Sequence, residues 1–297
     1  MSQENNCLVC NSKDMSFHLK CTDHLTGGGD FDIYICDNCG FMLTIDPPAK
    51  NEIEKYYDTV DYISHSDTKS GLTNILFHFT RNLMHYYKKH IIRKITRLKS
   101  GSLLDIGCGT GYFAAFMKYG GWKVTGLEAN KKARNFAREK FDLDVLDEIE
   151  IAEFKNSQFD CITLWHVFEH LHDPVKSLTN IKRLLKPGGV CIAAMPNCSS
   201  SDAQHYRQFW AAWDVPRHLW HFTTDTFRRF AGNAGFKLTG IRTLPLDVFY
   251  ISILSEKYKG SKIHFISGIL KALIFSFFTL FNKDRSSSLI YLLRKSF

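Results

Sequence analysis

The most constraining feature of this 297-residue chain is a short apolar strand that runs directly into a glycine-rich turn. Residues 102–106 (SLLDI) have the composition of a buried strand, and residues 107–111 (GCGTG) follow without a break. Residues 112–119 then have the apolar pattern of a helix. A strand, a glycine turn and a helix N-terminus let the backbone approach a nucleotide-like ligand closely. We therefore expect a nucleotide-binding unit at the start of the main domain.

The spacing of the glycines, G-x-G-x-G, does not match two common nucleotide-binding motifs. A dinucleotide fingerprint would have Gly or Ala where the chain has Tyr112, and a phosphate-binding loop would have Gly-Lys followed by Ser or Thr. A second strand is predicted at 122–127, and Glu128 follows it, 21 residues beyond Gly107. A carboxylate at that place can accept hydrogen bonds from the two ribose hydroxyls of an adenosine.

Strands alternate with helices along most of the chain. One or two helices are expected between residues 72 and 98, ahead of the first strand. Alternation of this kind predicts an α/β fold with a doubly wound, mostly parallel sheet. The predicted strands span residues 102–106, 122–127, 143–147, 159–164, 189–195 and 236–243.

Two CxxC pairs near the N-terminus predict a small zinc ribbon. Cys7 and Cys10 form one pair, Cys36 and Cys39 the other, and 25 residues separate them. Two such knuckles can supply the four thiolates of a tetrahedral zinc site, which would be structural because no position is left open. The polar N-terminus has no charged-then-apolar signal segment, so we expect a reducing cytoplasm, where paired cysteines favour metal binding over disulfides. The alternative is a chance pairing of core cysteines.

The order of these motifs resembles one family, the class I S-adenosylmethionine-dependent methyltransferases. The matching segments are 104–111 (LDIGCGTG), Glu128, 159–164 (FDCITL), 184–189 (LLKPGG) and 193–197 (AAMPN), within about residues 100–243. The resemblance implies a Rossmann-like sheet of seven strands whose last strand is antiparallel. Residues 288–293 are the candidate for that strand.

The resemblance also implies a set of cofactor-binding residues. The glycines would line the methionine and ribose portion of S-adenosylmethionine, the acid before them would order the turn, and Glu128 would hold the ribose. Asp147 is the candidate for the adenine-side acid, in a segment with five acids between residues 142 and 150. The full set is Asp105, Gly107, Gly109, Gly111, Glu128, Asp147 and His166.

A narrower resemblance, to a bacterial subgroup related to the ubiquinone-biosynthesis O-methyltransferases, covers nearly the whole chain. It is carried by residues 165–174 (WHVFEHLHDP) and 213–223 (WDVPRHLWHFT), and many members begin with a CxxC…CxxC module. The implied organisation is a zinc-ribbon module over 1–46, a helical lead-in over 47–99 and a methyltransferase domain over 100–297. An apolar insert is expected within that domain at about 247–285.

The loop after the fourth predicted strand carries the candidate catalytic residues. His166, Glu169 and His170 lie within about one helical turn, at the carboxyl edge of the sheet where ligands bind. His166 is the first choice for a general base and His170 the second; for each alone, a structural histidine is the alternative. The ubiquinone branch has Glu where His166 stands, and there the acid, acid and His are linked to a divalent cation. The change to imidazole argues against magnesium, which prefers oxygen ligands.

Three further expectations concern the partners of the chain. Arg217 is expected to meet an anionic group of the acceptor, which residues 213–223 would cover. Residues 263–281 are very apolar, and their pattern fits either a buried core helix or a helix lying in a membrane interface. A membrane span fits less well, because the segment is short for one. Basic residues flank this segment, so a peripheral site at the inner face of the membrane is one expected location.

Three functions fit these motifs. The first is O-methylation of a small-molecule, glycan or lipid-linked acceptor. The second is RNA methylation, which a zinc module and a net charge of +8 would suit, but an Asx-Pro-Pro-aromatic signature is missing after the fourth strand, so no nucleic acid is expected. The third is a non-catalytic binding module, against which Asp105, the glycine turn and Glu128 argue.

Overall fold

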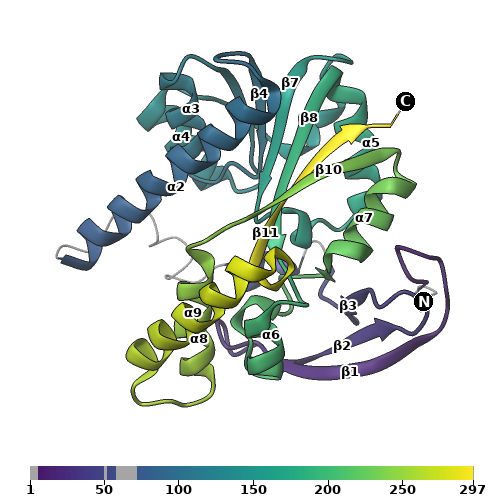
Figure 1. The fold of residues 1–297 in the computed structure, drawn as a ribbon. Coiled ribbons are helices and arrows are strands. Elements are labelled where there is room, and N and C mark those ends of the chain that lie inside the picture. Colours follow the sequence, from purple (N-terminus) through teal and green to yellow (C-terminus); the bar gives the residue numbers. More distant parts are fainter. Residues whose placement is uncertain (1–5, 50–51, 58–71, 297) are drawn as a thin grey trace.

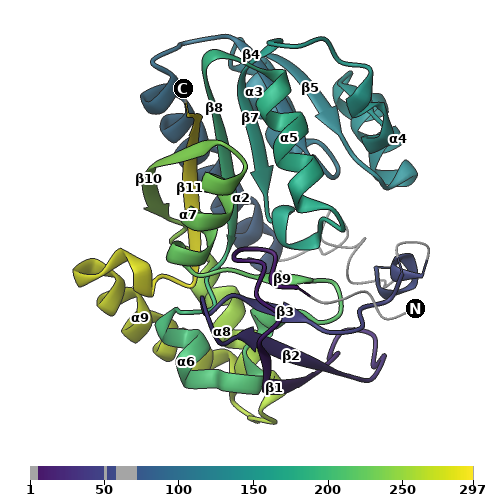
Figure 2. The ribbon, with the colours of Figure 1, turned by 90° about the vertical axis from the view of Figure 1, so that its right-hand side faces the viewer.

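The N-terminal strands and a later strand of the main domain form one small sheet. The computed structural model describes residues 6–49, 52–57 and 72–296, so residues 50–51 and 58–71 of the expected lead-in lie outside it. The strands β1 (Met15–Thr22), β2 (Asp30–Cys36) and β3 (Met42–Thr44) form an antiparallel meander. Figure 1 shows β1, β2 and β3, and the short strand β9 (Trp220–His221), labelled in Figure 2, pairs with β3 and completes the order β1-β2-β3-β9. Figure 2 shows this sheet below the main one.

The main sheet has seven strands in the order β10-β11-β8-β7-β4-β5-β6. Its last strand in sequence, β11, lies between β10 and β8 and is antiparallel to both, while β8, β7, β4, β5 and β6 are parallel. The predicted mostly parallel, seven-stranded Rossmann-like sheet is therefore confirmed. The strands are β4 (Ser102–Ile106), β5 (Lys123–Leu127), β6 (Asp144–Leu146), β7 (Phe159–Trp165), β8 (Leu185–Pro196), β10 (Phe236–Thr243) and β11 (Ser288–Lys295).

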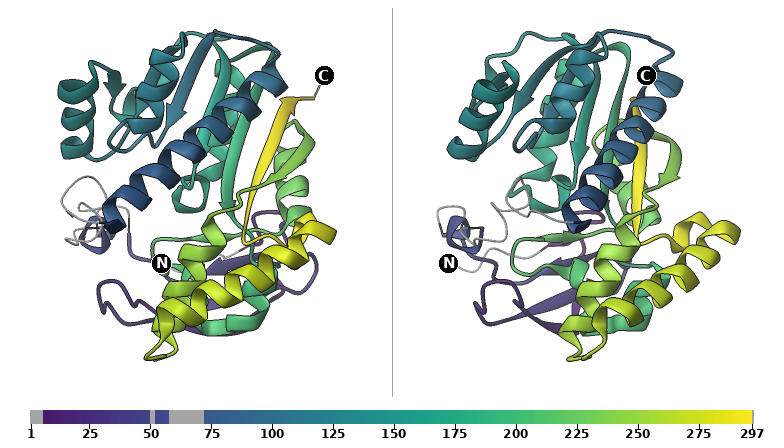
Figure 3. Two further views of the ribbon diagram at one scale, coloured as in Figure 1. Left: turned by 60° about the vertical axis from the view of Figure 1, so that its left-hand side comes forward. Right: turned by 90° about the vertical axis from the view of Figure 1, so that its left-hand side faces the viewer.

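Helices cover both faces of the main sheet because its strands are apolar on both sides. Leu103 packs in one core with side chains of α2 (Leu72–Thr96), α3 (Tyr112–Tyr119) and α4 (Lys131–Phe141). Leu104, the next residue, packs in the opposite core with α5 (Pro174–Leu184) and α7 (Thr224–Asn233). This alternation follows from the two-residue period of a strand. Figure 3 shows α2, in blue, crossing in front of the sheet.

The remaining elements lie mostly around the carboxyl edge of the main sheet and between the two sheets. They are η1 (Ile53–Tyr56), η2 (Glu148–Ala152), η3 (Phe168–His170), α6 (Ser201–Tyr206), η4 (Arg207–Phe209), η5 (Ala211–Trp213), α8 (Asp247–Tyr258), α9 (His264–Phe281) and η6 (Lys283–Arg285). The helix α9 corresponds to the apolar segment discussed above, and only 17% of its residues are buried. The interpretation of this segment as a buried core helix is therefore wrong.

A third core joins the N-terminal strands to the segments between β8 and β10 and between β10 and β11. Ile33 of β2 packs in this core with Trp210 and Trp213 beside η5, and Phe275 of α9 belongs to the same cluster. The N-terminal residues also contribute Phe41 to the core on the α5 and α7 face of the main sheet. Residues 6–46 thus share both a sheet and two cores with the main domain.

A buried arginine reinforces this junction. The guanidinium of Arg217 donates to Asp23 at 3.1 Å, to Asp214 at 2.7 Å and to the carbonyl oxygen of Tyr56 at 3.2 Å. Only 2% of its side chain is exposed. The expectation that Arg217 meets an anionic acceptor group is wrong, because two carboxylates of the protein already neutralise it.

We expect Arg217→Ala to lower the free energy of unfolding by about 3–5 kcal/mol, because it leaves Asp23 buried without its cation. Chemical denaturation followed by tryptophan fluorescence measures this loss. Arg228→Ala is the matched control: its ion pair with Asp225 is exposed, so the change should cost less than about 1 kcal/mol. Equal losses in the two variants would contradict the role given to Arg217.

Candidate functional site

The glycine turn follows β4, and its backbone is hydrogen-bonded to the carboxyl end of β5. The N–H groups of Gly107 and Cys108 donate to the carbonyl oxygen of Leu127 at 2.7 and 3.0 Å. Gly107 has a positive φ of 67°, and a Cβ at this place would lie 2.4 Å from Val167, in the loop after β7. Gly109 also has a positive φ, but no described atom lies within 4 Å of the place where its Cβ would point. The backbone is therefore open to a ligand at Gly109 and closed at Gly107.

The carboxylate of Glu128 lies beside this open backbone. One oxygen accepts a hydrogen bond from the N–H of Gly109 at 2.8 Å, and the other accepts one from the N–H of Asn130 at 2.9 Å. Burial raises the pKa of Glu128, and these two hydrogen bonds to the charged form oppose that rise. The arrangement agrees with the place expected for a ribose-binding acid, and that role stays a prediction.

The two other predicted acids have partners within the protein. Asp105 is buried and accepts a hydrogen bond from the Thr163 hydroxyl of β7 at 2.6 Å; burial raises its pKa to about 7. Asp147 caps η2 and forms an ion pair of 2.8 Å with Arg134, which also donates to the carbonyl oxygen of Glu128. Arg134 thus connects the segments that carry the predicted ribose and adenine acids.

Sequence analysis missed Lys88 and Asp247, which approach the same edge from α2 and α8. The Lys88 ammonium lies 4.3 Å from the centre of the Trp165 ring. Burial lowers its pKa to about 8, although Asp105 and Asp247 favour its charged form. The basic run between residues 81 and 99 was visible in the sequence. Only the placement of α2 against β7 shows which of its cations reaches the strand ends.

His166, at the end of β7, lies between two carboxylates. Its Nε2 is 2.8 Å from an oxygen of Asp247, and its Nδ1 is 3.4 Å from an oxygen of Glu169. Burial alone would lower the pKa of His166, but Asp247 and Glu169 together raise it to about 10. The imidazole is therefore protonated at neutral pH. This environment argues against His166 as a general base, the first choice from the sequence.

His170, in η3, has the opposite electrostatic environment. Burial and the neighbouring His218 lower the pKa of His170 to about 4, so its ring is neutral at neutral pH. Its Nδ1 lies 3.0 Å from the carbonyl oxygen of Arg217 and 2.9 Å from the hydroxyl of Tyr57. A hydrogen on Nδ1, donated to the carbonyl, leaves Nε2 with a lone pair.

His170 belongs to a buried cluster with Glu169 and His218. The ring centres of the two histidines are 4.6 Å apart, and Nε2 of His218 is 3.9 Å from an oxygen of Glu169. The other nitrogen of His218 lies 2.9 Å from the carbonyl oxygen of Ala212. Burial would raise the pKa of Glu169, but the histidines around it, His166 first, lower it below its ordinary value. Glu169 is therefore an anion with 1% of its surface exposed.

Two groups among the described residues offer enough ligands for a metal. One is Glu169, His170 and His218, whose ligand atoms lie within 4.8 Å of one another. The other is the four cysteines predicted from the two CxxC pairs, which the structure brings together. The sulfurs of Cys7 and Cys39 are 3.4 Å apart, and those of Cys10 and Cys36 are 3.5 Å apart. These spacings fit a zinc tetrahedron, whose edges are about 3.8 Å for Zn–S bonds of about 2.3 Å.

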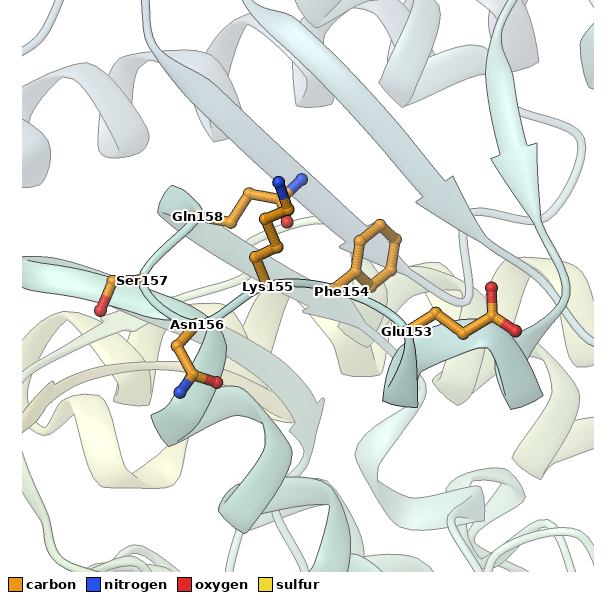
Figure 4. A pocket seen from close by; sticks show the side chains of 6 residues that line it. All are labelled: Glu153, Phe154, Lys155, Asn156, Ser157 and Gln158. Atoms are coloured by element: carbon orange, nitrogen blue, oxygen red, sulfur yellow. The ribbon is translucent and has the colours of Figure 1, made fainter.

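A surface hollow lined by Glu153, Phe154, Lys155, Asn156, Ser157 and Gln158 lies elsewhere (Figure 4). These residues precede β7 in the chain, so the hollow is at the amino end of that strand. The glycine turn, Glu128 and His166 follow the carboxyl ends of β4, β5 and β7, which is the edge where ligands bind in open α/β sheets. The hollow is therefore not part of the candidate site.

The sequence matches the family model for a methyltransferase domain over residues 80–240, which is more than half of the chain. The chain therefore belongs to this family of methyltransferase domains. It is also similar to ubiquinone biosynthesis O-methyltransferases. It is 33% identical over 107 residues to the protein from Alkalilimnicola ehrlichii, covering 34% of this chain and 43% of that protein. It is also 33% identical over 107 residues to the protein from Coxiella burnetii, covering 34% of this chain and 45% of that protein. The chain thus spans less than half the length of these relatives.

Two solved structures are similar in fold alone. A proposed sarcosine dimethylglycine methyltransferase from Galdieria sulphuraria has a TM-score of 0.53 at 16% identity, covering 74% of this chain and 88% of that one. The (4+2)-cyclase SpnF has a TM-score of 0.50 at 16% identity, covering 71% and 80%. The second structure is named as a cyclase, so the fold by itself does not define the reaction.

We expect the protein to bind S-adenosylmethionine and its demethylated product with a Kd of about 10⁻⁶ M. Glu128→Ala should weaken both ligands at least tenfold, because the carboxylate beside Gly109 would no longer accept the ribose hydroxyls. Calorimetry measures both affinities, and Glu139→Ala, on the exposed side of α4, is the control. Unchanged affinity in Glu128→Ala would contradict the assigned role.

Proposed function

We propose that the protein methylates a hydroxyl group of a small-molecule, glycan or lipid-linked acceptor, with His170 as the general base. The observation that carries this proposal is the neutral imidazole of His170 beside the buried carboxylate of Glu169, at the carboxyl end of β7. The similarity to ubiquinone biosynthesis O-methyltransferases supports oxygen as the methylated atom.

The proposed reaction asks the protein for orientation and one proton transfer. The sulfonium of S-adenosylmethionine supplies an activated methyl group, so that the new C–O bond forms as the S–C bond breaks. His170 accepts the hydroxyl proton on Nε2, because its Nδ1 hydrogen is held by the carbonyl oxygen of Arg217. The adjacent carboxylate of Glu169 stabilises the imidazolium that results. The glycine turn and Glu128 hold the methyl donor.

His166 has a positioning role in this proposal. As a cation between Asp247 and Glu169, it neutralises two carboxylates that would otherwise repel each other at the strand ends. It also ties α8 to β7 through its contact with Asp247. The backbone of His166 adopts a positive φ of 56°, which a non-glycine residue rarely does, so the contacts of its side chain compensate for strain.

We also propose that Cys7, Cys10, Cys36 and Cys39 hold one structural zinc ion. Each pair closes a tight knuckle: the N–H of Asn11 donates to the carbonyl oxygen of Cys7, and that of Gly40 to Cys36, both at 2.8 Å. Four protein ligands leave no position for water or substrate, so this metal would support the fold only.

Among the proposed acceptors, the lipid-linked class would bring the protein to the inner face of a membrane. The feature that supports it is α9, the one helix in the described ranges that is long and apolar enough to cross a membrane by length and composition.

We expect His170→Gln to lower the rate of methyl transfer by about 10²–10⁴-fold, because glutamine cannot accept the proton. The assay follows label from S-adenosylmethionine into a lipid and glycan extract of the source cell. Affinity for the demethylated product should stay unchanged, which separates loss of catalysis from loss of folding. His90→Gln, at an exposed position of α2, is the control. A His170→Gln variant with the wild-type rate would rule out this base.

We expect metal analysis to find one zinc per chain in the wild type and none in the double variant Cys36→Ser and Cys39→Ser, because only one knuckle would remain. Cys21→Ser is the matched control, since Cys21 lies in the same N-terminal strands but packs in the apolar core with Ile33. Zinc retained by the double variant would refute the four-cysteine site.

A further inference from the structure

The helix α9 carries a continuous apolar stripe on its outward side. Positions three and four apart lie on one face of a helix, and each of the following residues is more than half exposed. They are Ile266, Leu270, Leu273, Phe277, Leu280 and Phe281. A helix on the surface of a globular protein normally presents polar residues there, so this face needs a partner.

The inward side of α9 explains why the stripe cannot turn toward the protein. Gly268 faces α8 so closely that a Cβ would lie 2.8 Å from the backbone nitrogen of Ile253. Lys271 forms an ion pair of 2.8 Å with Glu256 of α8, and the Ser267 hydroxyl donates to the same carboxylate at 2.9 Å. Rotating the helix would break these contacts and leave the buried carboxylate of Glu256 without its cation.

Exposed basic residues stand at both ends of the stripe. They lie at the end of α8, in the segment between α8 and α9, and in η6 after α9, and Asp284 is an exposed acid nearby. The basic residues are Lys257, Lys259, Lys262, Lys283 and Arg285. An apolar face flanked by cations matches the layered chemistry of an anionic bilayer, which has acyl chains below negatively charged headgroups.

We propose that the outward face of α9 docks in the plane of an anionic phospholipid surface. A second copy of the chain fits less well, because a two-fold interface places the same surface on both partners and would bring the basic ends together. A membrane span fits less well too. Eighteen residues reach only about 27 Å, and one side of α9 is committed to α8.

Docking of α9 would bear directly on the candidate site. The helix α8, against which α9 packs, begins at Asp247, and this residue contacts His166 at 2.8 Å. One helix of 12 residues therefore separates the docked surface from the strand ends. The inference does not depend on the acceptor, because lipid binding can be measured without any methyl transfer.

Co-sedimentation with vesicles tests the proposal. The full-length protein is incubated with phosphatidylcholine vesicles that do or do not contain phosphatidylglycerol, across a series of salt concentrations. We expect binding to the anionic vesicles at low salt, at least tenfold weaker binding at high salt, and a similar loss with neutral vesicles. Phe277→Gln with Leu280→Gln should reduce binding at least tenfold and leave the melting temperature unchanged, because both side chains are exposed.

Matched variants separate lipid docking from general stickiness. Tyr119→Gln with Val175→Gln removes two exposed apolar side chains from other helices and should bind vesicles like the wild type. Lys257→Gln with Lys262→Gln should weaken binding to anionic vesicles and reduce its salt dependence. Wild-type protein that stays in the supernatant with anionic vesicles would overturn the proposal. A dimer in ultracentrifugation that the Phe277 and Leu280 variant dissociates would assign the face to a second copy and overturn it too.

Discussion

The buried guanidinium of Arg217 connects parts of this protein that are far apart in sequence. Its side chain joins Asp23 of the N-terminal strands to Asp214, and its carbonyl oxygen accepts from Nδ1 of His170. A cation that is buried and paired on two sides tolerates little displacement, since moving either carboxylate would leave it unpaired in a medium of low dielectric constant. The orientation of His170 is therefore tied to the packing of the N-terminal strands, and a structural zinc that stabilises those strands would also support the site.

Burial and charge assign different properties to two histidines that are four residues apart. Both rings lie next to Glu169, but His166 also meets Asp247, and the two anions raise its pKa to about 10. His170 meets a second histidine instead, and burial together with that neighbour lowers its pKa to about 4. One ring is therefore held as a cation that offsets negative charge, and the other is held neutral with a free lone pair. The division of roles in the proposed mechanism rests on this difference and not on residue type.

The parts of the fold that depend on local patterns could be predicted from the sequence. Strands with apolar residues on both faces, the glycine turn after β4 and the two CxxC pairs each have a local signal, and the mostly parallel sheet and the cysteine cluster followed from them. The seventh, antiparallel strand followed from the family resemblance. The contacts of the candidate site have no such signal. Asp247 reaches His166 from 81 residues further along the chain, and Asp23 reaches Arg217 from 194 residues earlier. Arg217 was assigned to an acceptor because a sequence does not show which carboxylates surround a cation.

The segment that became α9 shows the same limit for an apolar pattern. Residues 263–281 were compatible with a core, an interface or a span, since composition reports how apolar a helix is and not which side faces the protein. The polar residues of α9 show which side faces the protein: Lys271 and Ser267 turn inward to Glu256, and the larger apolar side chains are left outside. An exposed apolar face is unfavourable in water at about 25 cal/mol for each Å². The outward apolar face and the inward polar contacts of α9 are the basis of the proposal that this helix docks on a phospholipid surface.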